Sequence, residues 1–535
     1  MNGLPIGSSP NRKLRHYRRR QSATIEGMPP FSRQFEAALR ILETLRAEGH
    51  QAYLAGGCVR DLLLGRTPLD YDVATSATPD IVLKLFPRTF AVGAHFGVVL
   101  VADETLDEAP SFEDAEDAAP RYSVTEVATF RSDAAYSDGR HPDAVRYTTS
   151  AEEDVQRRDF TINGLLLDPV KILACETSEK LRDSAECQGA TFSRAGIPQK
   201  AIGALAPEPS LAPQRLRAAV LDYVGGLADL DACILRAIGD PLHRFEEDRL
   251  RLLRAVRFAA RFGFSLDPAT FSAIRALTPR IVSVSNERVR DELTKMLTEG
   301  KARRAFELMD ETGLLMEVLP EIVRMKGVEQ PPQFHPEGDD FLHTLLLLEQ
   351  LPLRCPRTLA WGALLHDVGK PPTFRIAPDR IRFDGHVEIG VAMGAEICRR
   401  LRFSNEETRQ ILALIENHMR FADAPRMKAS TLKRFFRLEK FEEHLELHRM
   451  DCLAAHGNLD IYNFVRERYE SMPEEDVRPA PLLTGRELIA AGYAPGPQFK
   501  EMLQTVEDAQ LDGAITTAEE ALALVRERFR AAGPL

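Results

Sequence analysis

The spacing of hydrophobic residues divides the chain into a mixed first part and a helical second part. Between residues 35 and 48 apolar side chains recur at helical spacing, and Asp80–Leu85 is predicted to be helical too. From Pro241 to the C-terminus helical patterns dominate. Short apolar runs that favour strands are Ala52–Ala55, Tyr71–Ala74, Val98–Ala102 and Val124–Phe130. The pattern predicts an α+β fold, with a small mixed sheet and its helices followed by all-helical domains.

Segments without periodic hydrophobic positions mark the domain limits. Residues 1–30 contain a basic stretch, Arg12–Arg20, which either contacts phosphates or is a disordered, solubilising tail. Residues 104–121 are acidic, and residues 170–218, with prolines and glycines, are predicted to be mostly loop. The predicted division is an arm at 1–30, a mixed head at 31–169, an insertion at 170–218, a helical neck at 219–330, a second helical domain at 331–470 and a C-terminal helical region at 471–535.

Composition narrows the class of protein. A length of 535 residues exceeds the roughly 250–300 residues at which single cores stop growing, so several domains are expected. Seven scattered cysteines without a C-x-x-C pair fit a reducing cytoplasm. No apolar run approaches the ~18–20 residues of a membrane span. The net charge of −11 is not the global signature of a nucleic-acid binder. We expect a soluble cytoplasmic protein that does not cross a membrane.

Candidate chemistry concentrates in the stretch Leu54–Val73, LAGGCVRDLLLGRTPLDYDV. Gly56 and Gly57 end an apolar segment just before a predicted helix. Glycines let the backbone approach a phosphate closely, and a helix start offers free N–H groups. Arg60 adds a permanent cation with a bidentate fork. This combination favours a site for nucleotide phosphates.

Two aspartates follow on a predicted strand. Asp70 and Asp72 flank Tyr71, and the alternation of a strand places both carboxylates on one face. Two such carboxylates repel each other unless a divalent cation lies between them. Oxygen ligands of this kind suit Mg²⁺ shared with triphosphate oxygens, and two metals could activate a 3′-hydroxyl and stabilise pyrophosphate.

The ordered combination resembles the first motif of the class II tRNA nucleotidyltransferase and bacterial poly(A) polymerase superfamily, within the DNA polymerase β-like fold. The resemblance implies that Asp70 and Asp72 bind metal. It also implies that Gly56, Gly57 and Arg60 lie at the nucleotide phosphates. The implied fold is a polymerase β-like head followed by an all-α neck and body.

Two further segments continue the resemblance. Residues 157–163, RRDFTIN, resemble the second motif, with Gly164 where the family usually has alanine. The resemblance implies that Arg158 and Asp159 contact the triphosphate and the ribose, and the alternative is a helix-capping salt-bridge cluster. Glu126, in a segment that resembles a family strand, is either a third carboxylate of the site or part of a structural ion pair.

The later motifs concern movement and base recognition. Residues 222–226, DYVGG, resemble the third motif, where a bend lets head and neck move. Residues 247–251, EDRLR, match the family's EDxxR pattern. Asp248 and Arg251 of this segment are predicted to face the same side of one helix. A carboxylate and a guanidinium together could mimic a Watson–Crick edge and read C and then A without a template; the alternative is a helix salt bridge.

Residues 131–142 correspond to the family's flexible loop, and its presence favours addition of the terminal A.

Arginines continue from this pair along nearly the same helical face. Arg254, Arg257 and Arg261 suit tRNA phosphates, and a solvated charged face is the competing interpretation. The same two interpretations apply to a locally basic stretch near the C-terminus, which contains Lys428, Lys433, Arg434 and Arg437.

A second constellation centres on residues 364–370, LLHDVGK. Imidazole and carboxylate groups together suit a transition metal such as Mn, Ni, Co, Fe or Zn, which could activate water on a phosphoester. The order of these residues along the chain resembles the HD-domain phosphohydrolases. The resemblance implies metal ligands at His343, His366, Asp367 and Asp451.

Some positions of this pattern stay open. Asp423 and Asp460 are alternatives to Asp451. His386 and His418 match family members that bind a second metal or the phosphate, and Lys370 could contact phosphate. The second helical domain at 331–470 is therefore expected to be an HD domain.

Together the resemblances imply CCA addition to tRNA 3′ ends from CTP and ATP, with phosphohydrolase activity of the HD domain on RNA 3′ ends or nucleotides. The alternatives are a poly(A) polymerase or a partial enzyme that adds only A or only CC. An alternative of another class is an HD-type phosphohydrolase whose N-terminal domain senses nucleotide or RNA. The sequence does not indicate an oligomeric state.

Overall fold

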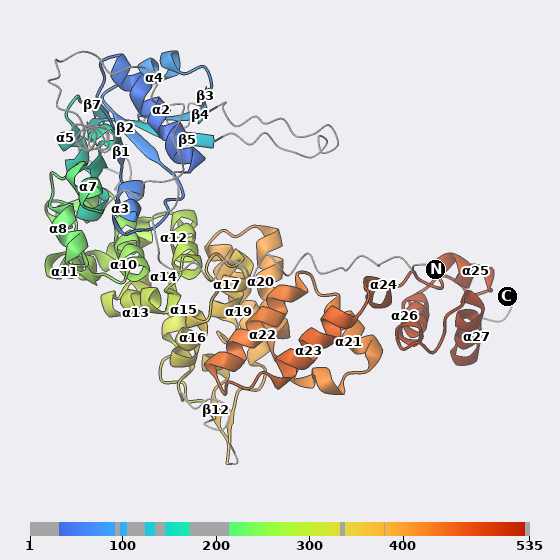
Figure 1. Cartoon of the computed structure of the whole chain (residues 1–535). Coiled ribbons are helices and arrows are strands. Elements are labelled where there is room, and N and C mark those ends of the chain that lie inside the picture. The colour runs from blue at the N-terminus through green and yellow to red at the C-terminus, as the bar shows by residue number, and fades with distance from the viewer. Residues whose placement is uncertain are drawn as a thin grey trace, which may run out of the picture. The chain divides into compact units, whose positions relative to one another are not determined.

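The computed structural model describes residues 32–90, 97–103, 123–133, 145–171, 213–331, 338–378 and 380–529. The described chain forms two compact units (Figure 1). The first comprises residues up to 232 together with 236–239, and the second comprises 233–235 and the chain from 240 onward. The predictions for residues 1–30, for 104–121, for most of 131–142 and for 172–212 lie outside the described residues.

The first unit is built on a mixed sheet. Within its described residues seven strands have the order β3-β4-β5-β2-β1-β8-β9, and β2 runs parallel to β5. The strands are β1 (Ala52–Ala55), β2 (Asp72–Thr75), β3 (Thr89–Phe90), β4 (Val98–Asp103), β5 (Ser123–Thr129), β8 (Leu166–Leu167) and β9 (Val220–Leu221), with β6 (Arg131–Asp133) and β7 (Val145–Tyr147) as a separate hairpin. The helical elements are α2 (Arg33–Ala47), α3 (Gly57–Leu63), α4 (Pro79–Leu85), α5 (Ala151–Gln156), the 3₁₀ turn η2 (Thr161–Asn163), α7 (Pro213–Ala218) and α8 (Gly226–Asp231).

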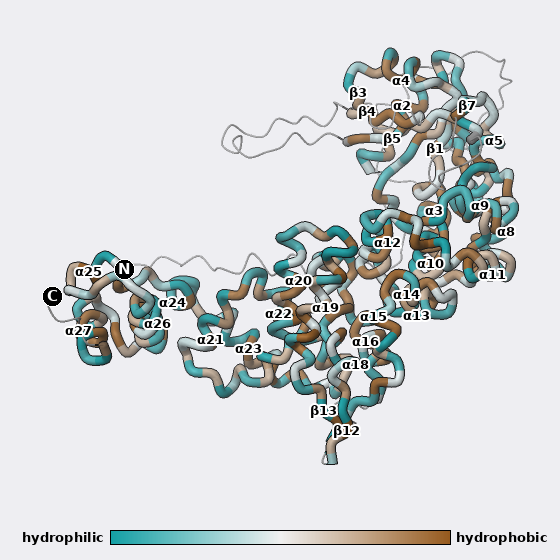
Figure 2. The backbone as a smooth tube through the Cα atoms, turned by 180° about the vertical axis from the view of Figure 1, so that it is seen from behind, coloured by the Kyte–Doolittle hydropathy of each residue, from teal (hydrophilic) through white to brown (hydrophobic). Residues whose placement is uncertain are grey.

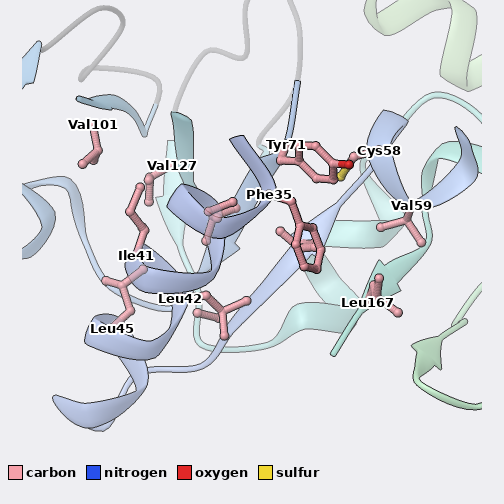
Figure 3. Close-up of a cluster of buried hydrophobic side chains, with 14 of the residues drawn as sticks. Phe35, Ile41, Leu42, Leu45, Cys58, Val59, Tyr71, Val101, Val127 and Leu167 are labelled. Carbon is pink, nitrogen blue, oxygen red and sulfur yellow. The ribbon is translucent and has the colours of Figure 1, made fainter. Parts of the chain in front are cut away.

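Helix α2 covers one face of this sheet. It begins where the Ser32 side chain accepts a hydrogen bond from the Phe35 amide. Its apolar stripe, which includes Ile41 and Leu42, is buried in one cluster with Tyr71, the residue before β2 (Figure 3). This helix agrees closely with the prediction for residues 35–48.

The opposite face of the sheet has a core of its own. Strand alternation places Val73 in the cluster under α2 and Ala74 in a second cluster with Val155 of α5. Asp72 therefore emerges on the α5 face. Asp72, one of the candidate carboxylates, lies on this second face of the sheet.

The strands confirm the predicted runs, with one correction. Asp70 is not on a strand, because β2 begins at Asp72. The neighbouring strand β1 ends at Ala55, which pairs with Asp72, and Gly56 then turns the chain away. Residues before Asp72 therefore have no residue of β1 to pair with, and the strand does not extend back to Asp70. The sequence also predicts a head that ends at residue 169, whereas β9 and α8 belong to the first unit.

The second unit is mainly helical. Its first helices are α9 (Pro241–Glu247), α10 (Leu250–Phe262), α11 (Pro268–Leu277), α12 (Asn286–Thr298), α13 (Ala302–Thr312), α14 (Leu314–Val318) and α15 (Pro320–Val323), with the 3₁₀ turn η3 (Thr278–Ser283). The HD region contains α16 (Asp340–Glu349), α17 (Arg357–Leu365), α18 (Lys370–Thr373), α19 (His386–Arg400), α20 (Asn405–Asn417), η4 (His418–Arg426), α21 (Ala429–Phe436), α22 (Phe441–Ala454) and α23 (Asp460–Ser471). Helices α24 (Glu474–Val477), α25 (Gly485–Ala490), α26 (Gln498–Leu511) and α27 (Ala518–Arg528) follow.

Two short strand pairs add to these helices, namely β10 (Ile234–Leu235) with β11 (Ser265–Leu266) and β12 (Arg375–Ile376) with β13 (Ile381–Arg382). Hydrophobic and hydrophilic segments alternate along the helices, as expected where each helix buries one face (Figure 2). Among the described helices, none has both the length and the hydropathy that a bilayer-spanning segment needs. The predicted α+β fold is confirmed.

Candidate active sites

The turn between β1 and α3 brings two sequence motifs into contact. Gly56 has a φ of 70°, a region that favours glycine, and its amide donates to the carbonyl of Leu165 at 3.2 Å. A Cβ atom on Gly56 would lie 3.2 Å from Nη1 of Arg158. The lack of a side chain therefore lets the arginine of the second motif pack over the turn of the first.

Three carboxylates gather beside this turn. The parallel register of β2 and β5 places Glu126 next to Asp72 on the same face of the sheet. Burial, followed by the charges of Glu126 and Asp70, raises the pKa of Asp72 to about 7. Loss of solvent and the charge of Asp70 also raise the pKa of Glu126. Arg158 opposes both shifts, so it lies within electrostatic reach of the cluster.

This cluster fits a divalent cation. Among the described residues, no hydrogen bond or ion pair neutralises the carboxylates of Asp70, Asp72 or Glu126. The alternative interpretation of Glu126, a structural ion pair, therefore finds no partner in the described chain. Oxygen-only ligands of high negative charge are those that Mg²⁺ prefers.

Asp154 of α5 anchors both arginines of the second motif. Its buried carboxylate accepts hydrogen bonds from Arg157 at 2.7 Å and from Arg158 at 2.9 Å. Burial raises the pKa of Asp154, but the charges of the two arginines outweigh it and the pKa is lowered. The salt-bridge cluster considered as an alternative is thus present, and it holds Arg158 beside the carboxylates.

The side chain of Asn163 joins Arg60 to Asp159. Arg60 Nη1 donates to Oδ1 of Asn163 at 2.5 Å, and Nδ2 of Asn163 donates to Oδ1 of Asp159 at 3.1 Å. Arg60 is only 4% exposed and also donates to Asp61 at 2.8 Å. Its guanidinium therefore positions the second motif, and its predicted contact with nucleotide phosphates stays a prediction. The sequence assigned no role to Asn163, because only its position inside the second motif pointed to a function.

The third motif packs tightly against the second. The carboxylate of Asp222 accepts hydrogen bonds from the amides of Val224, Gly226 and Leu227, and so caps the start of α8. A Cβ atom on Gly226 would lie only 2.3 Å from the carbonyl oxygen of Thr161. Glycine at this position is therefore required by close approach of the backbone.

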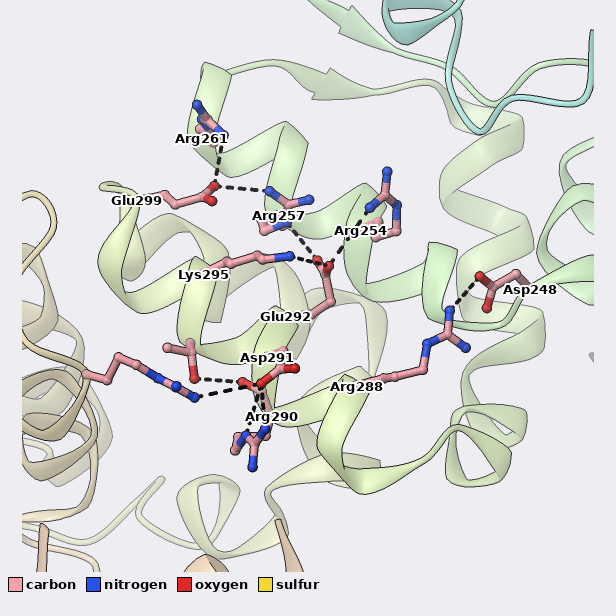
Figure 4. Close-up of polar contacts among 12 residues, drawn as sticks. Asp248, Arg254, Arg257, Arg261, Arg288, Arg290, Asp291, Glu292, Lys295 and Glu299 are labelled. Carbon is pink, nitrogen blue, oxygen red and sulfur yellow. Dashed lines mark hydrogen bonds and ion pairs between the residues drawn. The ribbon is translucent and has the colours of Figure 1, made fainter. Parts of the chain in front are cut away.

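The predicted base-reading pair does not share one helix. Helix α9 ends at Glu247, and Asp248 has extended backbone angles, φ −142° and ψ 105°, before α10 begins. The Asp248 carboxylate accepts from the Leu250 amide at 3.1 Å and from Nη2 of Arg288 at 2.8 Å (Figure 4). Arg251 donates to Glu247 at 2.5 Å. The prediction of one helical face for Asp248 and Arg251 is corrected, because Asp248 caps α10 instead of continuing α9.

The arginine stripe along α10 is paired with Glu292 of α12 and with Glu299, which directly follows that helix (Figure 4). Arg257 is buried and donates to Glu292 at 2.7 Å and to Glu299 at 3.0 Å. Arg261 also donates to Glu299 at 3.0 Å, and Arg254 lies 4.0 Å from Glu292. The predicted contact with tRNA phosphates stays a prediction, and for Arg257 it would require both ion pairs to break.

The HD residues converge from five segments of the second unit. Within the described residues, groups that could hold a metal ion are His343 with His366 and Asp451, and Asp367 with His386 and His418. In each group the ligand atoms lie within 4.8 Å of one another. Of the carboxylates considered for the last position, Asp451 is in the first group, and neither Asp423 nor Asp460 is.

The predicted ligand set is thereby divided, because Asp367 lies between the two groups. Its Oδ2 lies 2.9 Å from Nε2 of His366, and its Oδ1 lies 3.6 Å from Nε2 of His418 and 3.9 Å from that of His386. His366 and Asp367 lie in the turn between α17 and α18, where neighbours in sequence can face different groups. This carboxylate could bridge two ions.

Backbone carbonyls fix the orientation of three imidazoles. Nδ1 of His366, His386 and His418 lies 2.9, 2.9 and 2.7 Å from the carbonyl oxygen three residues earlier. A carbonyl only accepts, so Nδ1 carries the proton and Nε2 presents a lone pair. These Nε2 atoms and Oδ1 of Asp367 are buried and make no hydrogen bond in the described chain. The donor set fits transition-metal ions.

Lys370 lies behind Asp367. Its Nζ is 2.7 Å from Oδ2 of Asp367 and 2.6 Å from Oε1 of Gln330, and Asp340 is 3.6 Å away. Burial and the charge of Asp367 raise the pKa of Asp340 well above its ordinary value. Sequence reasoning missed Gln330 and Asp340, and the predicted contact of Lys370 with phosphate stays a prediction.

Basic residues in α21 and directly after it have partners on α26. Lys433 donates to the Leu511 carbonyl at 2.8 Å, and Arg434 and Arg437 donate to Glu507 at 3.1 and 2.5 Å. These contacts attach the C-terminal helices to the HD region. The prediction that this stretch binds tRNA is untested.

Three family models match in succession along the chain. Residues 52–190 match the poly A polymerase head domain, residues 263–325 the probable RNA and SrmB-binding site of polymerase A, and residues 342–456 the HD domain. The head match contains the carboxylate cluster, and the HD match contains both histidine-aspartate groups.

Several known proteins to which the chain is similar in sequence or structure are CCA-adding enzymes. The chain is 29% identical over 496 residues to that of Streptococcus pneumoniae serotype 19F, covering 92% of this chain and 98% of the relative. It is 35% identical over 282 residues to that of Geobacillus sp. strain WCH70, covering 53% of this chain and 54% of the relative. The Bacillus stearothermophilus enzyme in complex with CTP superimposes with a TM-score of 0.63 at 26% identity, over 93% of this chain and 98% of that one.

Proposed function

Since the chain belongs to the class II tRNA nucleotidyltransferase and poly(A) polymerase superfamily, with an HD domain fused behind the head and neck, we propose that it adds CCA to tRNA 3′ ends. The reaction uses CTP and ATP and needs no nucleic-acid template. The observation that carries this proposal is the cluster of Asp70, Asp72 and Glu126 beside Arg158. RNA binding alone requires no such group of carboxylates. The cytoplasm, where tRNA and both nucleotides are present, is the proposed location.

The head residues divide the work of phosphoryl transfer. Asp70 and Asp72 would hold Mg²⁺, and Glu126 lies beside Asp72 as a third oxygen donor. When bound, the ion supplies the positive charge that balances the triphosphate and the leaving pyrophosphate. Arg158, fixed by Asp154, provides a second positive charge on the same side of the sheet. The triphosphate is thereby oriented between these groups.

The second motif selects the sugar. Asp159 accepts hydrogen bonds through Oδ1 from Asn163 and from the Phe160 amide, which fixes the plane of its carboxylate. Such a carboxylate accepts a hydrogen bond from a ribose 2′-hydroxyl and so prefers NTP over dNTP. Arg60 and Asn163 are the positioning residues behind it.

Base selection falls to Asp248 and Arg251. A carboxylate accepts from N4 of cytosine, while a guanidinium donates to O2 and N3, and a shift of the pair reads adenine. Each residue has a protein partner, Arg288 for Asp248 and Glu247 for Arg251. On nucleotide binding, the base therefore replaces these protein partners or is bound in addition to them.

A second activity is proposed for the HD domain, namely metal-dependent phosphohydrolysis of RNA 3′ ends or nucleotides. It is favoured by buried Nε2 atoms of His366, His386 and His418 that make no hydrogen bond in the described chain. Mn, Ni, Co, Fe or Zn suits these donors, and such an ion supplies an activated water next to the phosphoester. His343 and Asp451 complete the first group, and Asp367 lies between both.

The head proposal is tested on tRNAs that lack CCA, end in C or end in CC. Each is incubated with Mg²⁺ and labelled CTP, ATP or both, and products are resolved at single-nucleotide length. Asp70→Asn and Asp72→Asn should abolish addition, whereas the exposed Asp80→Asn in the same unit should not. Long A tails would indicate a poly(A) polymerase, and addition of CC alone or A alone a partial enzyme. No incorporation by the wild-type chain would contradict nucleotidyl transfer.

The HD proposal needs separate substrates. RNAs ending in a 2′,3′-cyclic phosphate or a 3′-phosphate, and free nucleotides, are offered with each candidate metal. His366→Ala should remove hydrolysis, and Asp72→Asn should preserve it, because the two sites lie in different units. Hydrolysis that survives His366→Ala would contradict the assignment.

A further inference from the structure

The ammonium of Lys370 is enclosed by other side chains. It lies 2.7 Å from Oδ2 of Asp367, 2.6 Å from Oε1 of Gln330 and 3.6 Å from Oδ1 of Asp340. The Phe383 ring covers it at 5.4 Å from the centroid, and Lys370 is only 6% exposed. A lysine so enclosed is committed to the protein interior.

Two short backbone contacts hold its partners in place. An isolated bridge between Glu329 and Asp339 brings the chain before residue 331 next to the start of α16. The backbone N–H of Gln330 donates to the carbonyl of Gly338 at 3.1 Å, next to this bridge. Asp340 is fully buried, and neither of its carboxylate oxygens makes a hydrogen bond in the described chain. The partners of Lys370 are therefore fixed independently of any ligand.

We propose that Lys370 is a positioning residue of the HD metal centre, which with Gln330 and Asp340 locks the Asp367 carboxylate so that its Oδ1 faces His386 and His418. The inference rests on the metal centre of the proposed HD function. Lys370 holds Oδ2, and Oδ1 makes no hydrogen bond in the described chain. Rotation of the carboxylate about its own axis is thereby prevented.

The alternative is direct contact between Lys370 and a substrate phosphate. An ammonium has three donors, and Asp367 and Gln330 take two of them at hydrogen-bond distance, while the third faces Asp340. Moving the ammonium to a phosphate would leave two buried carboxylates, Asp340 and Asp367, without their cation. Breaking a buried pair in this way is strongly unfavourable. The geometry therefore favours positioning over phosphate binding.

The two roles differ in what a substitution changes. If Lys370 positions Asp367, Lys370→Met should weaken the ion held by Asp367, His386 and His418 more than the ion at His343, His366 and Asp451, because Asp367 is the only carboxylate of the second group. Loss of an outer partner of a metal ligand typically lowers metal affinity about 10–100-fold. Asp340→Asn should produce the same effect at smaller size, although Asp340 touches neither ion nor substrate. A phosphate ligand would instead leave metal binding unchanged and weaken only phosphate.

The experiment uses the full chain with Co²⁺ as the probe. Bound cobalt per chain, its dissociation constants and its visible absorption spectrum are measured for wild type, Lys370→Met and Asp340→Asn, together with the affinity for inorganic phosphate. Thr358→Val is the matched control, because it removes a buried hydrogen bond of 2.6 Å to Glu443 in the same region. CCA addition by the head and the thermal midpoint monitor folding of each variant.

With excess Mg²⁺ present to occupy the head carboxylates, the expected result is two cobalt ions in wild type and Thr358→Val. The second ion should bind at least tenfold more weakly in Lys370→Met, and should be weakened less in Asp340→Asn, with an altered spectrum in both. If Lys370→Met does not fold, the cobalt affinity and spectrum of Asp340→Asn alone test the positioning role. Two ions with unchanged affinity and spectrum in the variants would overturn the positioning role while leaving the metal centre intact. Fewer than two ions in wild type would overturn the two-ion centre itself.

Discussion

Replacement of Arg257 by methionine separates a structural role of the arginine stripe from an RNA-binding role. Arg257 is 5% exposed and makes two charged hydrogen bonds, to Glu292 and Glu299. Each such bond contributes about 1.5–3 kcal/mol, and breaking a buried pair costs about 3–5 kcal/mol. Because Lys295 lies 3.6 Å from Glu292 and Arg261 also bonds to Glu299, the lower end applies. We expect Arg257→Met to reduce the free energy of unfolding by about 3 kcal/mol.

Arg254→Met is the matched comparison on the same helix. The Arg254 side chain is 32% exposed and 4.0 Å from Glu292, so its loss should cost less than about 1 kcal/mol. Urea unfolding gives both values, and tRNA binding is measured as a function of salt. A phosphate contact removed by substitution lowers the slope of log affinity against log salt by about one. An Arg257→Met variant as stable as Arg254→Met, with a slope reduced by one, would refute the structural role.

Three further perturbations test the head. Because the pKa of Asp72 is raised to about 7, protons compete with Mg²⁺ for this carboxylate below that pH. The apparent Mg²⁺ affinity, measured from initial rates at pH 6 to 8, should fall about tenfold per pH unit below pH 7 and level off above it. An affinity that does not change with pH would contradict this. Gly226→Ala places a Cβ 2.3 Å from a carbonyl and should destabilise the first unit by more than about 3 kcal/mol, whereas Gly225→Ala, with a φ of 78° but open space, should cost about 1–2 kcal/mol in thermal unfolding. Asn163→Ala removes the link between Arg60 and Asp159, and should reduce the kcat/KM preference for CTP over dCTP about tenfold; unchanged discrimination would exclude a positioning role for Asn163.

Local patterns predicted four of the seven strands described in the head sheet, β1, β2, β4 and β5, because these are short apolar runs. They missed β3, β8 and β9, which have only two residues each. A further exception is Asp70, whose place depends on where the neighbouring strand β1 ends at Ala55. Asp248 shows a second limit. No proline or glycine interrupts residues 242–262, so helical periodicity continues through the break that the structure has between α9 and α10.

The site residues were predictable as motif positions, whereas their partners were not. The spacing of Arg254, Arg257 and Arg261 does not reveal that they pair with Glu292 of α12 and with Glu299 just after it. For the HD residues, the order along the chain indicated which side chains converge. The division into two groups, with Asp367 between them, depends on helix ends that only the folded chain defines.

The most direct test of the central claim is the 3′ sequence that the wild-type chain builds on a tRNA lacking CCA, with Mg²⁺ and all four nucleoside triphosphates at equal concentration. Sequencing of the product ends reads both nucleotide choice and termination. The account predicts C, C and A in that order, followed by no further addition. Tails of repeated A, or incorporation of G and U, would contradict template-independent CCA synthesis by this chain.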